Sequence, residues 1–132
     1  MTPSSPSSSP AKTIQVDSLP VRVYRTELEM AQEVAIIAQD HLQKVISQQG
    51  KARVILATGN SQINFLEALI ALGGVEWSKL TLFHMDEYLG ISRDHTASFR
   101  KYMRERVEAR VRPGQFHYLE GDALQPLDEC VR

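Results

Sequence analysis

The sequence predicts a doubly wound α/β fold, with a Rossmann-like, mostly parallel sheet and helices on both faces. Apolar segments of strand length alternate along the chain with amphipathic segments of helical period, which is the order of elements found in such folds. Hydrophobic residues make up 42% of the 132 residues, enough to form the core of one globular unit. Short turns that contain glycine separate the segments.

Charge and cysteine content exclude several kinds of partner and site. The formal net charge is -1, with basic residues scattered among acidic ones, so there is no excess of positive potential for nucleic acid or anionic lipid. The single cysteine, Cys130, cannot form an internal disulfide, and no Cys and His spacing is typical of a zinc site. We therefore expect a cytoplasmic protein that binds neither nucleic acid nor membrane and holds no metal or other cofactor.

The first 19 residues are expected to form a disordered tail. The stretch MTPSSPSSSPAK is rich in Ser and Pro and contains no apolar block, so it cannot bury enough surface to offset the entropy of ordering. It has neither the apolar segment of a secretion signal nor the Arg-rich pattern of an organelle signal. We expect one domain over residues 20–132.

The first elements of this domain follow from local signals. A first strand of the sheet is predicted at residues 21–24. Thr26 and Glu29 have the spacing of a capping box, so a long helix should begin there and end at Gly50. Residues 52–57 form a near-continuous apolar run, which is typical of a parallel strand buried on both faces.

The alternation continues through the second part of the chain. A helix is predicted after the loop at residues 58–61, and Gly73 and Gly74 should end it. Strands are predicted at residues 80–85 and 116–119. Because helices alternate with these strands, the sheet should be parallel, with right-handed crossovers.

A third helix is predicted from about residue 96 until Pro113 and Gly114 halt it. Met103 and Val107 are its expected core contacts. We interpret its charged residues as a solvated face with opposite-charge neighbours. These residues are Arg100, Lys101, Arg104, Arg106, Arg110, Glu105 and Glu108.

Two loops follow predicted strands, at the edge where open α/β sheets bind their ligands. In the first, LATGNSQ, Ser61 stands at the expected helix N-cap. Unpaired N–H groups at a helix N-terminus can hold a phosphate, and the hydroxyls of Thr58 and Ser61 would add donors. A simple capping turn explains the same residues and is favoured on this loop alone, because the loop is neither a Walker A loop nor a dinucleotide fingerprint.

In the second loop, FHMDEYLGISRDH, two carboxylates follow the strand. A carboxylate beside a bound sugar phosphate could abstract a proton from a carbon next to a carbonyl. An N-capping or salt-bridged acidic turn is the alternative, and spacing alone does not separate the two. Neighbouring residues on an extended chain point in opposite directions, so Asp86 and Glu87 should have different roles. His84 is interpreted as a hydrogen-bonded core or near-site histidine and not as a metal ligand.

Both loops resemble those of a known family, the glucosamine-6-phosphate deaminases, within the wider group that includes 6-phosphogluconolactonase. FHMDEYLGISRDHTASFRKYM is similar to the family's strand-end F-x-M-D-E-Y-x-G with its following His and S-[FY] pair. LATGNSQINFLEAL resembles the family's phosphate loop, L-P-T-G-G-T-P. The loop departs from that pattern at Ala57, Asn60 and Gln62, where the family has Pro, Gly and Pro.

The resemblance implies roles for particular residues. Asp86 matches the general base that moves a proton between C2 and C1 of the ring-opened amino sugar. Glu87 and Tyr88 match residues next to that base, and Glu87 could equally be structural. Four loop residues match those that hold the phosphate or lie beneath the sugar: Thr58, Gly59, Asn60 and Ser61.

The implied activity is conversion of glucosamine 6-phosphate and water to fructose 6-phosphate and ammonia, a step of amino sugar metabolism and N-acetylglucosamine catabolism. Its partner would be a small-molecule sugar phosphate. The family's later G-x-G-x-D-G-H-I-A-F-N-E-P segment is absent, and the chain stops within an expected helix at residues 127–132. We therefore expect the N-terminal half of a longer enzyme, with a fold incomplete at its C-terminus and no activity alone. A homo-oligomer is compatible with the exposed sheet edge that would result.

Two alternatives stay open. A sugar-phosphate lactonase has the same fold, but resemblance would then place D-E-R where this chain has Asp86, Glu87 and Tyr88. A non-catalytic sugar-phosphate-binding module is the other, and continuation of the gene into the glycine-rich, histidine-containing segment would eliminate it.

Overall fold

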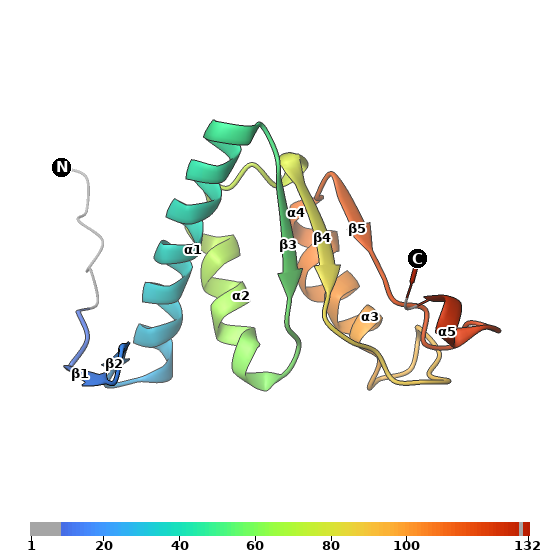
Figure 1. The fold of residues 1–132 in the computed structure, drawn as a ribbon, viewed down its shortest axis with the longest axis horizontal. Coiled ribbons are helices and arrows are strands. Elements are labelled where there is room, and N and C mark those ends of the chain that lie inside the picture. The colour runs from blue at the N-terminus through green and yellow to red at the C-terminus, as the bar shows by residue number, and fades with distance from the viewer. Residues whose placement is uncertain (1–8, 130) are drawn as a thin grey trace.

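The structure is a computed structural model that describes residues 9–129 and 131–132 (Figure 1). Three strands form a parallel sheet in the order β3-β4-β5, and helices connect them, which confirms the predicted α/β class. The elements in chain order are β1 (Lys12–Val16), β2 (Leu19–Val23), α1 (Glu27–Gln49), β3 (Ala52–Leu56), α2 (Asn60–Leu72), η1 (Trp77–Lys79), β4 (Leu80–His84), α3 (Phe99–Met103), η2 (Arg104–Glu108), α4 (Ala109–Val111), β5 (Gln115–His117) and α5 (Pro126–Glu129).

The helices that connect the strands pack on one face of the sheet. Leu66 of α2 is buried with Met103 and Val107 of the third helix, against the inward side chains of β3 and β4. Those strand side chains are Ala52, Leu56, Leu80 and Leu82. Strands that follow chain order, joined by right-handed crossovers, place successive helices on the same side. Among the described residues the opposite face is open, and Ile55 on it is 65% exposed, whereas the sequence predicts helices on both faces.

Helix α1 has the predicted start and end. The Thr26 side chain accepts a hydrogen bond from the Glu29 N–H at 3.1 Å, and the Glu29 carboxylate accepts one from the Arg25 N–H at 3.2 Å. Gly50 ends the helix in the left-handed conformation at φ 75°. Within the described ranges, no helix is long and apolar enough to cross a lipid bilayer.

The N-terminal strands form a hairpin of their own. β1 pairs with β2 in antiparallel register, and Figure 1 shows the hairpin beside the start of α1, apart from the parallel sheet. Two predictions are therefore wrong here: residues 21–24 do not provide a first strand of that sheet, and residues 12–19 of the predicted tail are ordered. Alternating polar and β-branched residues on both sides of a turn at Asp17 favour strands over disorder. The tail prediction for residues 1–8 lies outside the described residues.

The third predicted helix is continuous but irregular. It consists of α3, the π-helical segment η2 and α4, and it begins after the N-cap Ser98, not at residue 96. The side chains of Met103 and Val107 are fully buried, as predicted. The helix ends at Val111, and its C-cap, Arg112, lies just before a proline.

Candidate functional site

The loops after β3 and β4 leave the sheet at the same edge. Leu56, the last residue of β3, pairs with His84, the last residue of β4. Both strands point downwards in Figure 1, and the two loops start from their lower ends. All the site residues predicted from the sequence lie in these two segments, at residues 58–61 and 86–88.

Gly59 shapes the first loop. Its φ of 121° is a value that residues with side chains rarely adopt, and it caps α2 without a side-chain hydrogen bond. The helix begins at Asn60, so Ser61 is an exposed residue of the first turn and not the N-cap. The predicted cap is therefore wrong, because glycine accommodates the conformation through which the chain enters the helix. Thr58 before it is partly buried.

Asp86 and Glu87 have different surroundings, as their opposite directions on the chain predict. Asp86 is exposed, and its carboxylate forms no hydrogen bond or ion pair with the described part of the chain. The side chain of Glu87 is only 1% exposed. The Asp86 carboxylate is thus accessible to a ligand, while the Glu87 carboxylate is buried in the protein.

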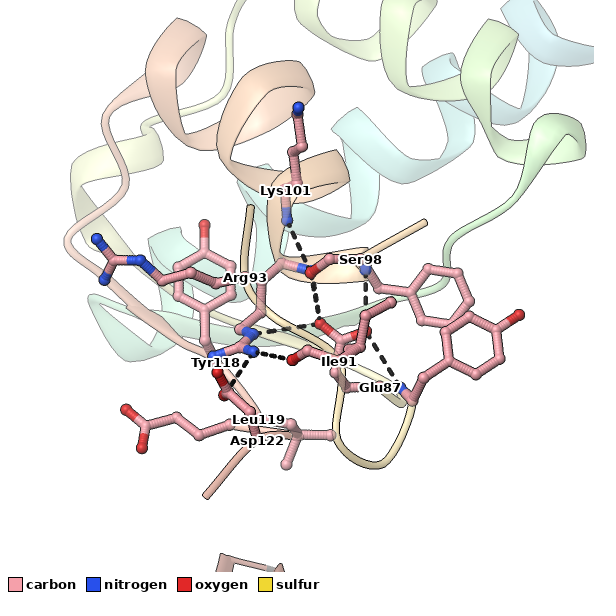
Figure 2. A network of polar contacts seen from close by, with 12 residues as sticks. Glu87, Ile91, Arg93, Ser98, Lys101, Tyr118, Leu119 and Asp122 are labelled. Carbon is pink, nitrogen blue, oxygen red and sulfur yellow. Dashed lines mark hydrogen bonds and ion pairs between the residues drawn. The ribbon is translucent and has the colours of Figure 1, made fainter. Parts of the chain in front are cut away.

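Glu87 holds the N-terminus of α3 (Figure 2). Its carboxylate accepts hydrogen bonds from the Ser98 hydroxyl at 2.8 Å, from the Phe99 N–H at 3.0 Å and from the Arg100 N–H at 3.1 Å. The Tyr88 N–H also donates to it, at 3.1 Å. Burial opposes ionisation, but these hydrogen bonds outweigh it and lower the pKa of the Glu87 carboxyl.

Arg100 is the buried counterion of Glu87. Its Nε lies 3.2 Å from the Glu87 carboxylate, and its Nη2 donates to the Ile91 carbonyl at 2.9 Å and to Asp122 at 2.8 Å. Arg100 is 6% exposed, so its predicted place on the solvated face is wrong. A cation in the first turn of a helix interacts unfavourably with the helix dipole. The buried carboxylate of Glu87 beside Arg100 offsets that unfavourable interaction.

A turn near the C-terminus packs against the second loop. The Gly90 N–H donates to the Gly121 carbonyl at 2.7 Å. A Cβ at Gly121 would overlap the Tyr88 carbonyl oxygen and come within 2.9 Å of Glu87 Cγ. Glycine is therefore required here for close approach of two backbone segments.

His84 connects the end of β4 to the same turn. It is 4% exposed, and its Nε2 accepts a hydrogen bond from the Leu119 N–H at 2.8 Å, as expected for a hydrogen-bonded core histidine. Burial lowers the pKa of His84, against the opposing effects of Glu87 and Asp86. An Nε2 that accepts from a backbone amide belongs to the neutral tautomer with its proton on Nδ1. No three His, Cys, Asp or Glu side chains in the described ranges are arranged to hold a metal ion.

Sequence reasoning misses four residues that shape the two loops. The Tyr102 hydroxyl donates to the Gly59 carbonyl at 3.0 Å, so α3 contacts the first loop as well as the second. Arg100, Gly121 and Asp122 support the second loop. The first-turn position of Arg100 is the one local signal that could have identified any of them.

Comparisons with known proteins found relatives of this chain by sequence and by fold. Residues 25–132 match the family described as glucosamine-6-phosphate isomerases/6-phosphogluconolactonase. Glucosamine-6-phosphate deaminase 2 of Giardia intestinalis is 28% identical over 110 residues, which are 80% of this chain and 42% of that protein. A solved monomeric glucosamine-6-phosphate deaminase superimposes with a TM-score of 0.71 at 28% identity, covering 81% of this chain and 45% of that one.

A 6-phosphogluconolactonase from Shewanella baltica shares the fold, with a TM-score of 0.66 at 23% identity over 73% of this chain and 41% of that one. The chain thus spans less than half the length of the curated relatives it matches. Because the family match covers both loops and every element from α1 onwards, the chain belongs to the glucosamine-6-phosphate isomerase/6-phosphogluconolactonase family.

Proposed function

We propose that residues 20–132 form the N-terminal part of an amino-sugar-phosphate isomerase and deaminase that converts glucosamine 6-phosphate and water to fructose 6-phosphate and ammonia. The observation that carries the proposal is the exposed carboxylate of Asp86, which has no hydrogen bond or ion pair among the described residues and lies one strand away from the N-terminus of α2. A proton acceptor and an anion-binding helix end at one sheet edge suit a sugar phosphate. The lone cysteine and the phosphorylated substrate favour a cytoplasmic location.

The N-terminus of α2 is proposed to bind the phosphate. In its first turn, the N–H groups of Asn60 and Ser61 have no acceptors within the helix, whereas that of Gln62 donates to the Gly59 carbonyl. The positive φ of Gly59 lets the chain turn into the helix without a side chain in the way. The exposed side chains of Asn60 and Ser61 can add donors. The phosphate would thereby anchor the sugar with its other end towards β4.

Asp86 is proposed as the base. In the ring-opened amino sugar it takes the proton from C2, which gives an enolamine, and returns a proton to C1. The resulting ketose imine adds water and releases ammonia. A carboxylate at the end of a buried strand loses little freedom when substrate binds, which supports this role.

A lactonase is the second candidate, and Tyr88 argues against it. Tyr88 stands where the resemblance leads us to expect an arginine in a lactonase. Its side chain is 55% exposed and its ring packs against Phe99, with 5.0 Å between ring centroids. A neutral, partly stacked ring at this position suits an amino sugar better than an acidic lactone product.

The test is Asp86→Asn in the proposed full-length enzyme. Loss of the base should slow exchange of the C2 hydrogen of glucosamine 6-phosphate in heavy water by about 10²- to 10⁴-fold. Binding of the sugar phosphate, measured by calorimetry, should persist. Glu67→Gln, on the exposed side of α2, is the matched control and should leave exchange unchanged. Undiminished C2 exchange in Asp86→Asn would refute the assignment of Asp86 as the base. Ammonia release by the 132-residue chain alone would refute the proposal that the chain is only part of the active enzyme.

A further inference from the structure

One short helix contacts both candidate loops. Arg100, in the first turn of α3, reaches Glu87 of the second loop, and Tyr102, two residues later, reaches the Gly59 carbonyl of the first. Residues two apart on a helix point in different directions. The helix therefore lies between the loops and bonds to each through a different side chain.

The contact with the second loop is extensive. The side chains of Glu87 and Arg100 are 1% and 7% exposed, so solvent screens their interaction little. The same guanidinium bonds to the Ile91 carbonyl and to Asp122. In Figure 2 the partners of this guanidinium, Glu87, Ile91 and Asp122, lie close together where the loop and the C-terminal turn meet the helix.

Among the residues that the structure describes, one hydrogen bond joins α3 to the first loop. Tyr102 is partly buried, and burial raises the pKa of its hydroxyl, so the group remains a donor at neutral pH. Its acceptor is the carbonyl of Gly59, the residue whose positive φ sets the entrance to α2. A change in this hydrogen bond would act on the loop proposed to bind phosphate and not on Asp86.

We propose that Arg100 and Tyr102 are positioning residues that set the relative placement of the proton-transferring carboxylate and the phosphate loop. Arg100 acts through Glu87 on the segment that carries Asp86, and Tyr102 acts through Gly59 on the phosphate loop. The inference rests on the proposed function of the two loops. It predicts that the two side chains affect different kinetic constants.

The geometry of Arg100 distinguishes it from a simple counterion. Its planar fork serves three acceptors in fixed directions, at Glu87 and Ile91 of the second loop and at Asp122 of the C-terminal turn, whereas a lysine carries one compact charge on a flexible stem. Arg100→Lys should thus keep a positive charge next to Glu87 but lose the fixed directions of the hydrogen bonds that Arg100 donates. Tyr102→Phe keeps the ring and removes only the donor.

The first measurement is amide hydrogen exchange in the 132-residue chain. Arg100→Lys should speed exchange at Gly90, whose N–H bonds to Gly121, on the order of tenfold. Tyr102→Phe should do the same at Gln62, whose N–H bonds to the Gly59 carbonyl. Amides of β3 and β4 should keep their protection in both variants.

Two matched controls apply the same chemical changes elsewhere. Arg110→Lys alters an arginine that pairs with the exposed Glu67, and Tyr24→Phe alters a tyrosine between β2 and α1. Neither should change exchange at the two loops. Equal acceleration throughout the sheet by Arg100→Lys and Tyr102→Phe would overturn the proposal, because it would show loss of global stability only.

The second measurement is steady-state kinetics in the proposed full-length enzyme, well below its unfolding temperature. Arg100→Lys should lower kcat about tenfold with KM changed less than about twofold, because Asp86 is misplaced. Tyr102→Phe should mainly raise KM for glucosamine 6-phosphate. Unchanged kcat and KM in both variants would overturn the proposal. Absence of C2 exchange in the unsubstituted enzyme would instead refute the proposed function, and hydrogen exchange would still test whether α3 holds the loops.

Discussion

The two loops at the carboxyl edge of the sheet are held in place by different physical means. The first, at residues 57–61, relies on the backbone conformation of Gly59 and on one hydroxyl. The second, at residues 85–98, is fixed by a buried carboxylate and a buried guanidinium. In the proposed function the first loop must keep the N–H groups of Asn60 and Ser61 free for an anion, and rigid backbone geometry suits this requirement.

In the proposed function the second loop has to keep a carboxylate unpaired instead of N–H groups. For that function its exposed carboxylate, Asp86, would have to stay unpaired to accept a proton and yet be held in position. The adjacent residue resolves the conflict, because the Glu87 carboxylate makes the bonds that fix the backbone, while the Asp86 carboxylate makes no hydrogen bond or ion pair with the described residues. In the proposed function Glu87 thereby fixes the backbone, and the neighbouring Asp86 stays available for proton transfer.

If this comparison is right, the largest effect on stability should come from removing Glu87. Glu87→Ala would leave Arg100 buried without its carboxylate and would unpair the start of α3, which should lower the free energy of unfolding by about 3–5 kcal/mol. Urea denaturation followed by circular dichroism measures this free energy of unfolding. Glu67→Ala removes an exposed partner of Arg110 and should change stability by less than about 1 kcal/mol. Similar values for the two variants would contradict a special role for the buried pair.

A smaller effect is expected at the turn that supports the second loop. Gly121→Ala places a methyl group against the Tyr88 carbonyl, and the overlap should lower the free energy of unfolding by about 1–3 kcal/mol. The place where the structure loosens is the sharper readout, since the Gly90 amide should lose protection from hydrogen exchange. Gly50→Ala also strains the chain but at a site with open space, and it should leave Gly90 protected relative to the rest of the chain. Retained protection in Gly121→Ala would count against the close packing.

Acid should weaken the second loop before the first. The pKa of Glu87 is lower in the folded chain than its ordinary value of 4.5, so the folded state binds fewer protons. Its stabilising contribution is complete above pH 4.5 and is lost as the pH falls through the lower folded value. Glu87→Gln should therefore show a flatter dependence of unfolding free energy on pH below 4.5 than the unsubstituted chain. Parallel curves for the two proteins would exclude this linkage.

Sequence patterns predict the parts of this molecule that local chemistry determines. The caps of α1, the parallel sheet and the buried Met103 and Val107 all follow from periodicity and from residue preferences near helix ends. The motif residues of the two loops also stand at the predicted sheet edge.

What the sequence does not predict depends on contacts between distant segments. Arg100 has the pattern of a solvated helix face, and its burial depends on Glu87, 13 positions earlier, and on Asp122, 22 positions later. The close approach of Gly121 to the second loop likewise has no local signal. The hairpin of β1 and β2 is a different case. Its alternating polar and β-branched residues are a local signal, but the Ser- and Pro-rich residues before it lead to the prediction of a disordered tail.

The smallest effect on stability should come from Ser61, in the first loop. As an N-cap it would contribute about 1 kcal/mol, but it lies exposed in the first turn of α2, where alanine is a better helix former. Ser61→Ala should therefore change the free energy of unfolding by less than about 0.5 kcal/mol. Thr26→Ala, at the true cap of α1, should lower it by about 1 kcal/mol in the same urea titration. Equal losses in the two variants would place the start of α2 at Ser61. Weaker binding of glucosamine 6-phosphate by the proposed full-length enzyme, without a change in stability, would identify the Ser61 hydroxyl as a ligand donor instead of a cap.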